Sequence, residues 1–146
     1  MSVLRIHYLK SKNKMRIDEL MIGNLVSVGG YPLTVLTING ESDAFDQVYL
    51  ESEDDYEWYR LSSIEPIPIT EEWLLKLGFN KMSGCFNFDR SKELGHHFGD
   101  FALSIYDITQ LKFWRGDRYC GVIVCEHVHE LQNLFFSLTK EKLKIK

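Results

Sequence analysis

Short apolar segments separated by glycine-containing turns are the feature that most limits what this chain can fold into. The segment NLVSV is followed by Gly29-Gly30, and YPLTVLTI is followed by Asn39-Gly40. Gly-Gly and Asn-Gly accept the positive φ angles that tight hairpin turns require. Further strands fit QVYLE and EWYRL, with Asp54-Asp55 between them. Residues 15–68 are therefore predicted to form a small barrel-like β-meander.

A different pattern begins after this meander. Pro66 and Pro68 lack amide donors, so the segment IEPIPIT is predicted to be a connector that ends the first unit. Thr70 is a suitable N-cap for a helix near 71–77, and an apolar stripe at helical spacing predicts a second helix near 126–138. Between them lie CFNFD, FALSIYD, LKFWR and RYCGVIVC, which are typical of strands.

The predicted fold class is therefore α+β and mostly β. Residues 69–146 are expected to form an antiparallel sheet with both short helices, and the apolar face of the terminal helix is expected to close that sheet. Residues 1–14 form either an N-terminal extension or an extra strand.

The composition is that of a globular chain: 146 residues, of which 45% are hydrophobic and 26% are charged. No apolar run is long enough to cross a membrane, and the N-terminus lacks the basic-then-apolar order of a secretory signal. Three cysteines are too few for a disulfide framework. The sequence thus predicts a cytoplasmic protein without a membrane partner, and it leaves the oligomeric state open.

An acidic tract with interleaved aromatic residues is the strongest candidate for a binding surface. Between Glu41 and Glu72 the only basic residue is Arg60. Such a tract repels nucleic acid phosphates, and it can imitate a nucleic acid backbone or dock on the basic surface of a protein partner. A merely solvated strand face would give the same pattern. The candidate residues are Asp43, Asp46, Glu51, Glu53, Asp54, Asp55, Glu57 and Trp58.

Three other kinds of site are weaker. Stacking of single-stranded nucleic acid on Tyr and Trp residues is possible in small barrels, but the charge has the wrong sign. Thiolate and imidazole ligands suggest a zinc site, yet the spacing does not fit and the strand places the two cysteines on opposite faces, so no metal and no cofactor is predicted. The residues of that rejected site are Cys120, Cys125, His127 and His129.

A loop at 95–100 carries His96, His97 and Asp100, and a histidine beside a carboxylate can act as a general acid or base. This loop keeps two alternatives open: a small-ligand or nucleotide binder, and a hydrolase that uses the same histidines. No nucleophile with a positioned base is found, so the sequence favours a protein that is not an enzyme.

Three phrases, IGNLV, EPIPITEEWLLKLGF and HVHELQNLFFSLTKEKL, together resemble a group of small uncharacterised proteins found in genomes, phages and mobile elements of Bacteroidota. The resemblance covers roughly residues 16 to 143 and implies no catalytic residues. It does imply an accessory role in a phage or mobile element. The predicted function is therefore a non-enzymatic protein-binding module that acts on a host factor.

Overall fold

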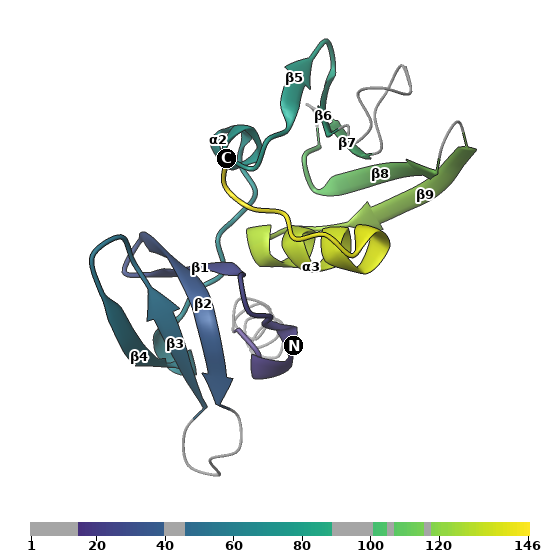
Figure 1. Cartoon of the computed structure of the whole chain (residues 1–146). Coiled ribbons are helices and arrows are strands. Elements are labelled where there is room, and N and C mark those ends of the chain that lie inside the picture. Colours follow the sequence, from purple (N-terminus) through teal and green to yellow (C-terminus); the bar gives the residue numbers. More distant parts are fainter. Residues whose placement is uncertain (1–14, 40–45, 89–100, 105–106, 116–117) are drawn as a thin grey trace, which may run out of the picture. The chain divides into compact units, whose positions relative to one another are not determined.

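The computed structural model describes residues 15–39, 46–88, 101–104, 107–115 and 118–146, which form a mostly β structure (Figure 1). It contains two antiparallel sheets, one of four strands and one of five, with the helices α2 and α3. The predicted α+β, mostly β class is thus confirmed. In chain order the elements are η1 (Ile17–Glu19), β1 (Leu25–Val28), β2 (Tyr31–Asn39), β3 (Gln47–Glu51), β4 (Tyr56–Arg60), η2 (Leu61–Ser63), α2 (Glu71–Lys76), β5 (Asn80–Met82), β6 (Cys85–Phe88), β7 (Phe101–Ser104), β8 (Gln110–Arg115), β9 (Arg118–Val124) and α3 (Val128–Thr139).

The first sheet has the order β1-β2-β3-β4, and each neighbouring pair is antiparallel. Gly29 and Gly30 form the β1–β2 turn with φ angles of 59° and 86°, the positive values that a two-residue hairpin turn requires. One face of the sheet carries the core. Its most deeply buried strand residues are at most 1% exposed, namely Val26, Val35, Val48 and Leu50.

After η2 the chain returns to the outer edge of β1. Ser27 and Glu65 exchange two backbone hydrogen bonds, with N–H to O distances of 2.9 and 2.8 Å. This bridge covers the side of β1 that does not face β2. Within the described residues β4 pairs with β3 alone, so the sheet is open at β4. The barrel-like closure of the meander therefore stays a prediction.

Helix α3 is bonded to the first sheet through its polar side chains. The N–H of Leu25 donates to Oε1 of Gln132 at 2.8 Å, and Nε2 of Gln132 donates to the carbonyl of Gly23 at 3.2 Å. Asn133 donates from Nδ2 to the carbonyl of Glu19 at 2.7 Å. By its contacts the chain divides into one unit of residues up to Ile67 with Val128–Lys142, and a second of Pro68–His127 with Leu143–Lys146.

This division differs from the predicted boundaries, which placed residues 69–146 in one unit. The first crossing, between Ile67 and Pro68, lies at the predicted connector, but α3 groups with the meander. The apolar stripe of α3 led to the sequence assignment, whereas the long-range hydrogen bonds of Gln132 and Asn133 tie the helix to the first unit.

The second sheet has the order β5-β6-β7-β8-β9, and its core includes Phe86, Leu103 and Leu111. Helix α2 lies in the same unit and confirms the helix predicted near 71–77. Its N-cap Thr70 accepts a hydrogen bond from the N–H of Trp73 at 3.3 Å. Of the helices in the described part of the chain, none is long and apolar enough to span a membrane.

Candidate partner-binding face

The candidate site is built on the hairpin of β3 and β4. Its turn is closed by the N–H of Ser52, which donates to the carbonyl of Asp55 at 2.9 Å, and by the N–H of Asp55, which donates to Oγ of Ser52 at 3.2 Å. The carboxylate of Asp55 also accepts from the N–H of Tyr56 at 2.8 Å. Asp55 is therefore partly a turn-forming residue, and Glu53 and Asp54 are left exposed at the tip.

Three aromatic side chains form a cluster on the face of this hairpin that lies opposite the core. Tyr49 lies between the buried residues Val48 and Leu50 and so points to the opposite face, and Trp58 is its register partner on β4. The ring centroid of Tyr49 lies 5.0 Å from that of Trp58 and 6.2 Å from that of Tyr56. We call the surface formed by Tyr49, Tyr56 and Trp58 the aromatic face.

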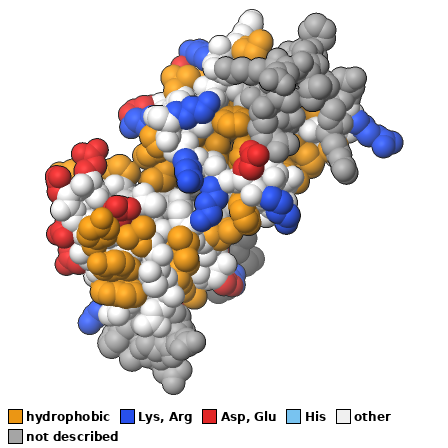
Figure 2. Space-filling model, in the orientation of Figure 1, with side chains coloured by type: hydrophobic (Ala, Val, Ile, Leu, Met, Phe, Trp, Pro, Cys, Tyr) orange, Lys and Arg blue, Asp and Glu red, His pale blue; other side chains and the backbone are white. Residues whose placement is uncertain are grey.

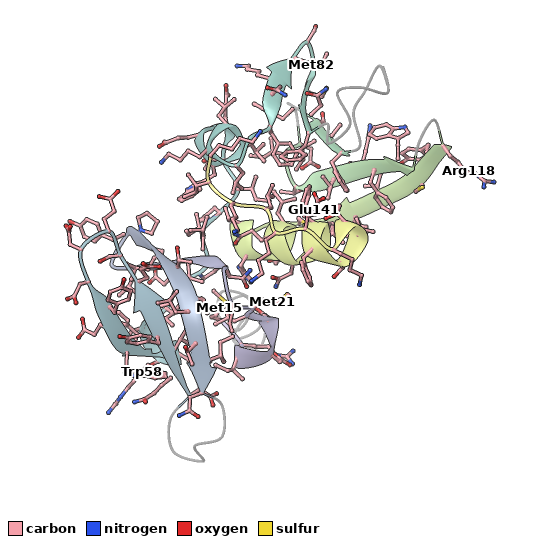
Figure 3. All side chains as sticks on the ribbon, viewed as in Figure 1. Met15, Met21, Trp58, Met82, Arg118 and Glu141 are labelled. Atoms are coloured by element: carbon pink, nitrogen blue, oxygen red, sulfur yellow. The ribbon has the colours of Figure 1, made fainter. Side chains whose placement is uncertain are left out.

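The aromatic face is open to solvent. Tyr56 is 56% exposed and Trp58 is 46% exposed, which is unusual for such large side chains. Figure 2 shows hydrophobic side chains gathered over the first sheet with acidic side chains beside them. Trp58 extends from β4, the strand at the edge of the sheet (Figure 3). Aromatic residues exposed in this way often mark a surface that a partner covers.

The predicted acidic residues do not all lie on this face. Glu51 pairs with Tyr56 and shares the aromatic face, and Glu53, Asp54 and Asp55 border it at the turn. Glu57 pairs with the buried Leu50 and so lies on the opposite side of the strand.

The remaining two predicted acidic residues lie elsewhere. Asp46 is at the far end of the hairpin, where its carbonyl accepts from the N–H of Leu61 at 3.0 Å. Asp43 lies outside the described residues. Of the predicted acidic residues that the structure describes, Asp46 and Glu57 therefore lie off the aromatic face.

Within the described residues, the carboxylates of the hairpin form no ion pair with a lysine or an arginine. Residues 51–60 contain five carboxylates and one guanidinium. The ion pairs of the described residues that involve lysine or arginine lie elsewhere: Arg16 with Asp18 at 2.6 Å, Lys76 with Glu72 at 2.9 Å and Lys81 with Glu71 at 2.7 Å. A negative field thus remains available to a cationic partner at the aromatic face.

The ionisation of Tyr59 reflects the same environment. Burial raises the pKa of its phenol above the ordinary value of 10.0, and the hydrogen bond from its hydroxyl to Oε2 of Glu57, at 3.2 Å, raises the pKa further. The negative charges of Glu57 and Asp55 act in the same direction. Removal from water is thus the main reason that this phenol resists ionisation, and the neighbouring carboxylates add to it.

The other predicted sites gain no support from the described residues. His96, His97 and Asp100 lie outside them. Cys120 is exposed while Cys125 is buried, and no three His, Cys, Asp or Glu side chains of the described part lie close enough to hold a metal ion.

Tyr49 and Tyr56 were not among the predicted binding residues, although the sequence contains the signal for them. Residues two apart on a strand share a face, so Tyr56 follows directly from Trp58. Tyr49 requires the register of the hairpin, and the turn predicted at Asp54-Asp55 differs by one residue from the tip at Glu53 and Asp54 that the pair of Ser52 and Asp55 closes. The structure fixes it by pairing Glu51 with Tyr56.

No family model matches this chain, and neither does any curated protein or solved structure. A functional conclusion must therefore come from the geometry of the hairpin itself.

Proposed function

We propose that this chain is a non-enzymatic protein-binding module whose aromatic face engages a basic surface of a partner protein. The observation that supports the proposal is the pair of exposed rings of Tyr56 and Trp58, which both contact the half-buried ring of Tyr49 and are bordered by carboxylates that form no ion pair within the described residues. Arg and Lys side chains are attracted to the faces of Trp and Tyr rings, and nearby carboxylates strengthen that attraction.

The chemistry of the face selects the class of partner. Aromatic residues are enriched at the energetic centres of protein interfaces, because they bury large areas at a small cost in side-chain entropy. Glu51, Glu53 and Asp54 repel phosphate groups and so disfavour nucleic acid. The resemblance to phage and mobile-element proteins supports a host protein of the cytoplasm as the partner.

The proposal is tested with a short fluorescent peptide of alternating arginine and threonine, measured by anisotropy at low and at high salt. We expect binding at low salt that weakens as salt is added, because exposed charges are screened over ~10 Å at 0.1 M. A peptide with glutamate in place of arginine should not bind.

Two variants test the face directly. Trp58→Ala removes an aromatic contact, and the double variant Glu53→Lys with Asp54→Lys reverses two charges whose side chains form no hydrogen bond in the described structure. Each should weaken binding by about tenfold. Glu141→Lys, at an exposed position away from the hairpin (Figure 3), is the matched control and should bind like the wild type. Wild-type affinity in both face variants would reject the proposal.

A further inference from the structure

Among the strands of the described residues, β4 is the open edge of the first sheet. The opposite edge, at β1, is covered by the bridge between Ser27 and Glu65. Edge strands expose backbone N–H and C=O groups that can pair with another chain, and proteins usually protect them with proline, lysine or a covering segment. The sequence of β4, YEWYR, contains neither proline nor lysine.

The hydrogen bonds that bracket the hairpin show which backbone groups face outward. The N–H of Ser52 bonds to the carbonyl of Asp55, and the N–H of Leu61 bonds to the carbonyl of Asp46. Antiparallel pairing alternates, so Glu57 and Tyr59 direct their backbone groups to β3.

The alternate residues Tyr56 and Trp58 direct their backbone groups to the open edge of the sheet. Trp58 presents both its N–H and its C=O there. Tyr56 presents its C=O, because its N–H donates to Asp55 Oδ1. In the described structure these outward groups of Trp58 have no hydrogen-bond partner.

The same two residues carry the exposed rings of the aromatic face. A strand added beside β4 would lie about 4.8 Å away, and its alternate side chains would be spaced like those of Tyr56 and Trp58. Arg or Lys at these alternate positions would lie within the ~6 Å over which a cation is attracted to an aromatic ring. The acidic tip of the hairpin would lie at one end of the added strand.

We infer that β4 binds an extended basic segment of a partner protein as a fifth strand, with alternate Arg or Lys side chains on the aromatic face. This inference rests on the proposed function and adds the mode of recognition. Charge complementarity selects this occupant over a second copy of the chain. Two copies of a chain with a formal net charge of -4 repel each other, and an antiparallel β4–β4 pair centred on Glu57 would also place two like charges directly opposite each other.

The experiment uses the arginine–threonine peptide in three forms: unmethylated, N-methylated at the arginines, and N-methylated at the threonines. The two methylated forms have the same charge and equal numbers of methyl groups, but in an extended strand they block opposite edges. In antiparallel addition the residues opposite Trp58 bond to it, so methylated arginines should weaken binding by about tenfold or more, and methylated threonines should not. In parallel addition the threonines bond to Trp58 instead, so methylated threonines should weaken binding and methylated arginines should not.

The outcomes separate the inference from the proposed function. If methylation weakens the affinity of one peptide more than that of the other, strand addition is supported, and the weaker peptide shows whether the added strand is antiparallel or parallel. Equal affinity of all three peptides overturns strand addition while the proposed function stands. An equal loss of affinity in the two methylated peptides has the same meaning. Failure of the unmethylated peptide to bind rejects both. A dimer of the chain alone that Trp58→Ala dissociates would identify a second copy as the occupant and overturn the inference.

Amide hydrogen exchange of the full chain supplies a second measurement. The Trp58 N–H should exchange rapidly alone and at least about tenfold more slowly with the unmethylated peptide bound. The amides of Glu57 and Tyr59, which face β3, should be protected in both states. An unchanged exchange rate at Trp58 with saturating peptide would also overturn strand addition.

Discussion

Replacing Gln132 by alanine should destabilise the first unit by about 2–4 kcal/mol. The side chain is 4% exposed, and its Oε1 is the acceptor for the buried N–H of Leu25 at 2.8 Å. Leaving that N–H without an acceptor costs ~1–3 kcal/mol. The lost hydrogen bond from Nε2 to the carbonyl of Gly23, at 3.2 Å, adds ~0.5–1.5 kcal/mol.

The assay is urea unfolding of the full chain, together with hydrogen exchange at the Leu25 amide. Ser137→Ala is the matched control, because Ser137 lies on the same helix, is exposed, and bonds only within the helix to the carbonyl of Asn133 at 2.9 Å. It should change stability by less than about 0.5 kcal/mol. Equal unfolding midpoints and equal Leu25 exchange rates in the two variants would refute the role of Gln132 as an anchor.

Three further changes test the local structure. Gly30→Ala should lower the free energy of unfolding by about 1–2 kcal/mol, because a residue with a Cβ is strained at a φ of 86°. Nothing lies within 4 Å of the added Cβ, so the backbone conformation alone causes the loss. An unchanged urea midpoint would contradict this. Thr70→Ala should cost about 1 kcal/mol in the same assay, because the Trp73 N–H loses its cap, and Thr70→Ser should restore most of the loss. Tyr59 should ionise above pH 10.0, as followed by the absorbance difference between the wild type and Tyr59→Phe. Because its folded pKa exceeds the unfolded value, its contribution to stability is complete below the unfolded pKa and is lost as pH rises through the folded pKa; a midpoint at or below 10.0 would contradict this.

Features coded by neighbouring residues were predictable from the sequence. The Gly29-Gly30 turn, the Thr70 cap and the connector around Pro68 each depend on the conformational limits of a few adjacent residues. The structure places a hairpin, a helix and a unit crossing at these positions.

Features that depend on distant partners were not predictable. The sequence predicts Gln132 to be an exposed polar residue on an amphipathic helix. Only the fold brings it to Leu25, which lies 107 positions earlier in the chain. The candidate site shows the same limit. The alternation of side chains along β4 is enough to predict that Glu57 and Trp58 lie on opposite faces. The contact of Trp58 with Tyr49 could not be predicted in this way, because it depends on the register of the hairpin.

The route of the chain through the first unit has a consequence for its synthesis. The chain leaves this unit at Ile67 and re-enters it at Val128, whose N–H donates to the carbonyl of Ile67 at 2.8 Å. Residues 68–127 are thus an insertion with adjacent ends. On the ribosome, all of residues 68–127 emerge before α3, so they can begin to fold before Gln132 is available to accept the hydrogen bond of the Leu25 N–H. The first unit therefore begins before the insertion is made and gains its helix only after the insertion has emerged.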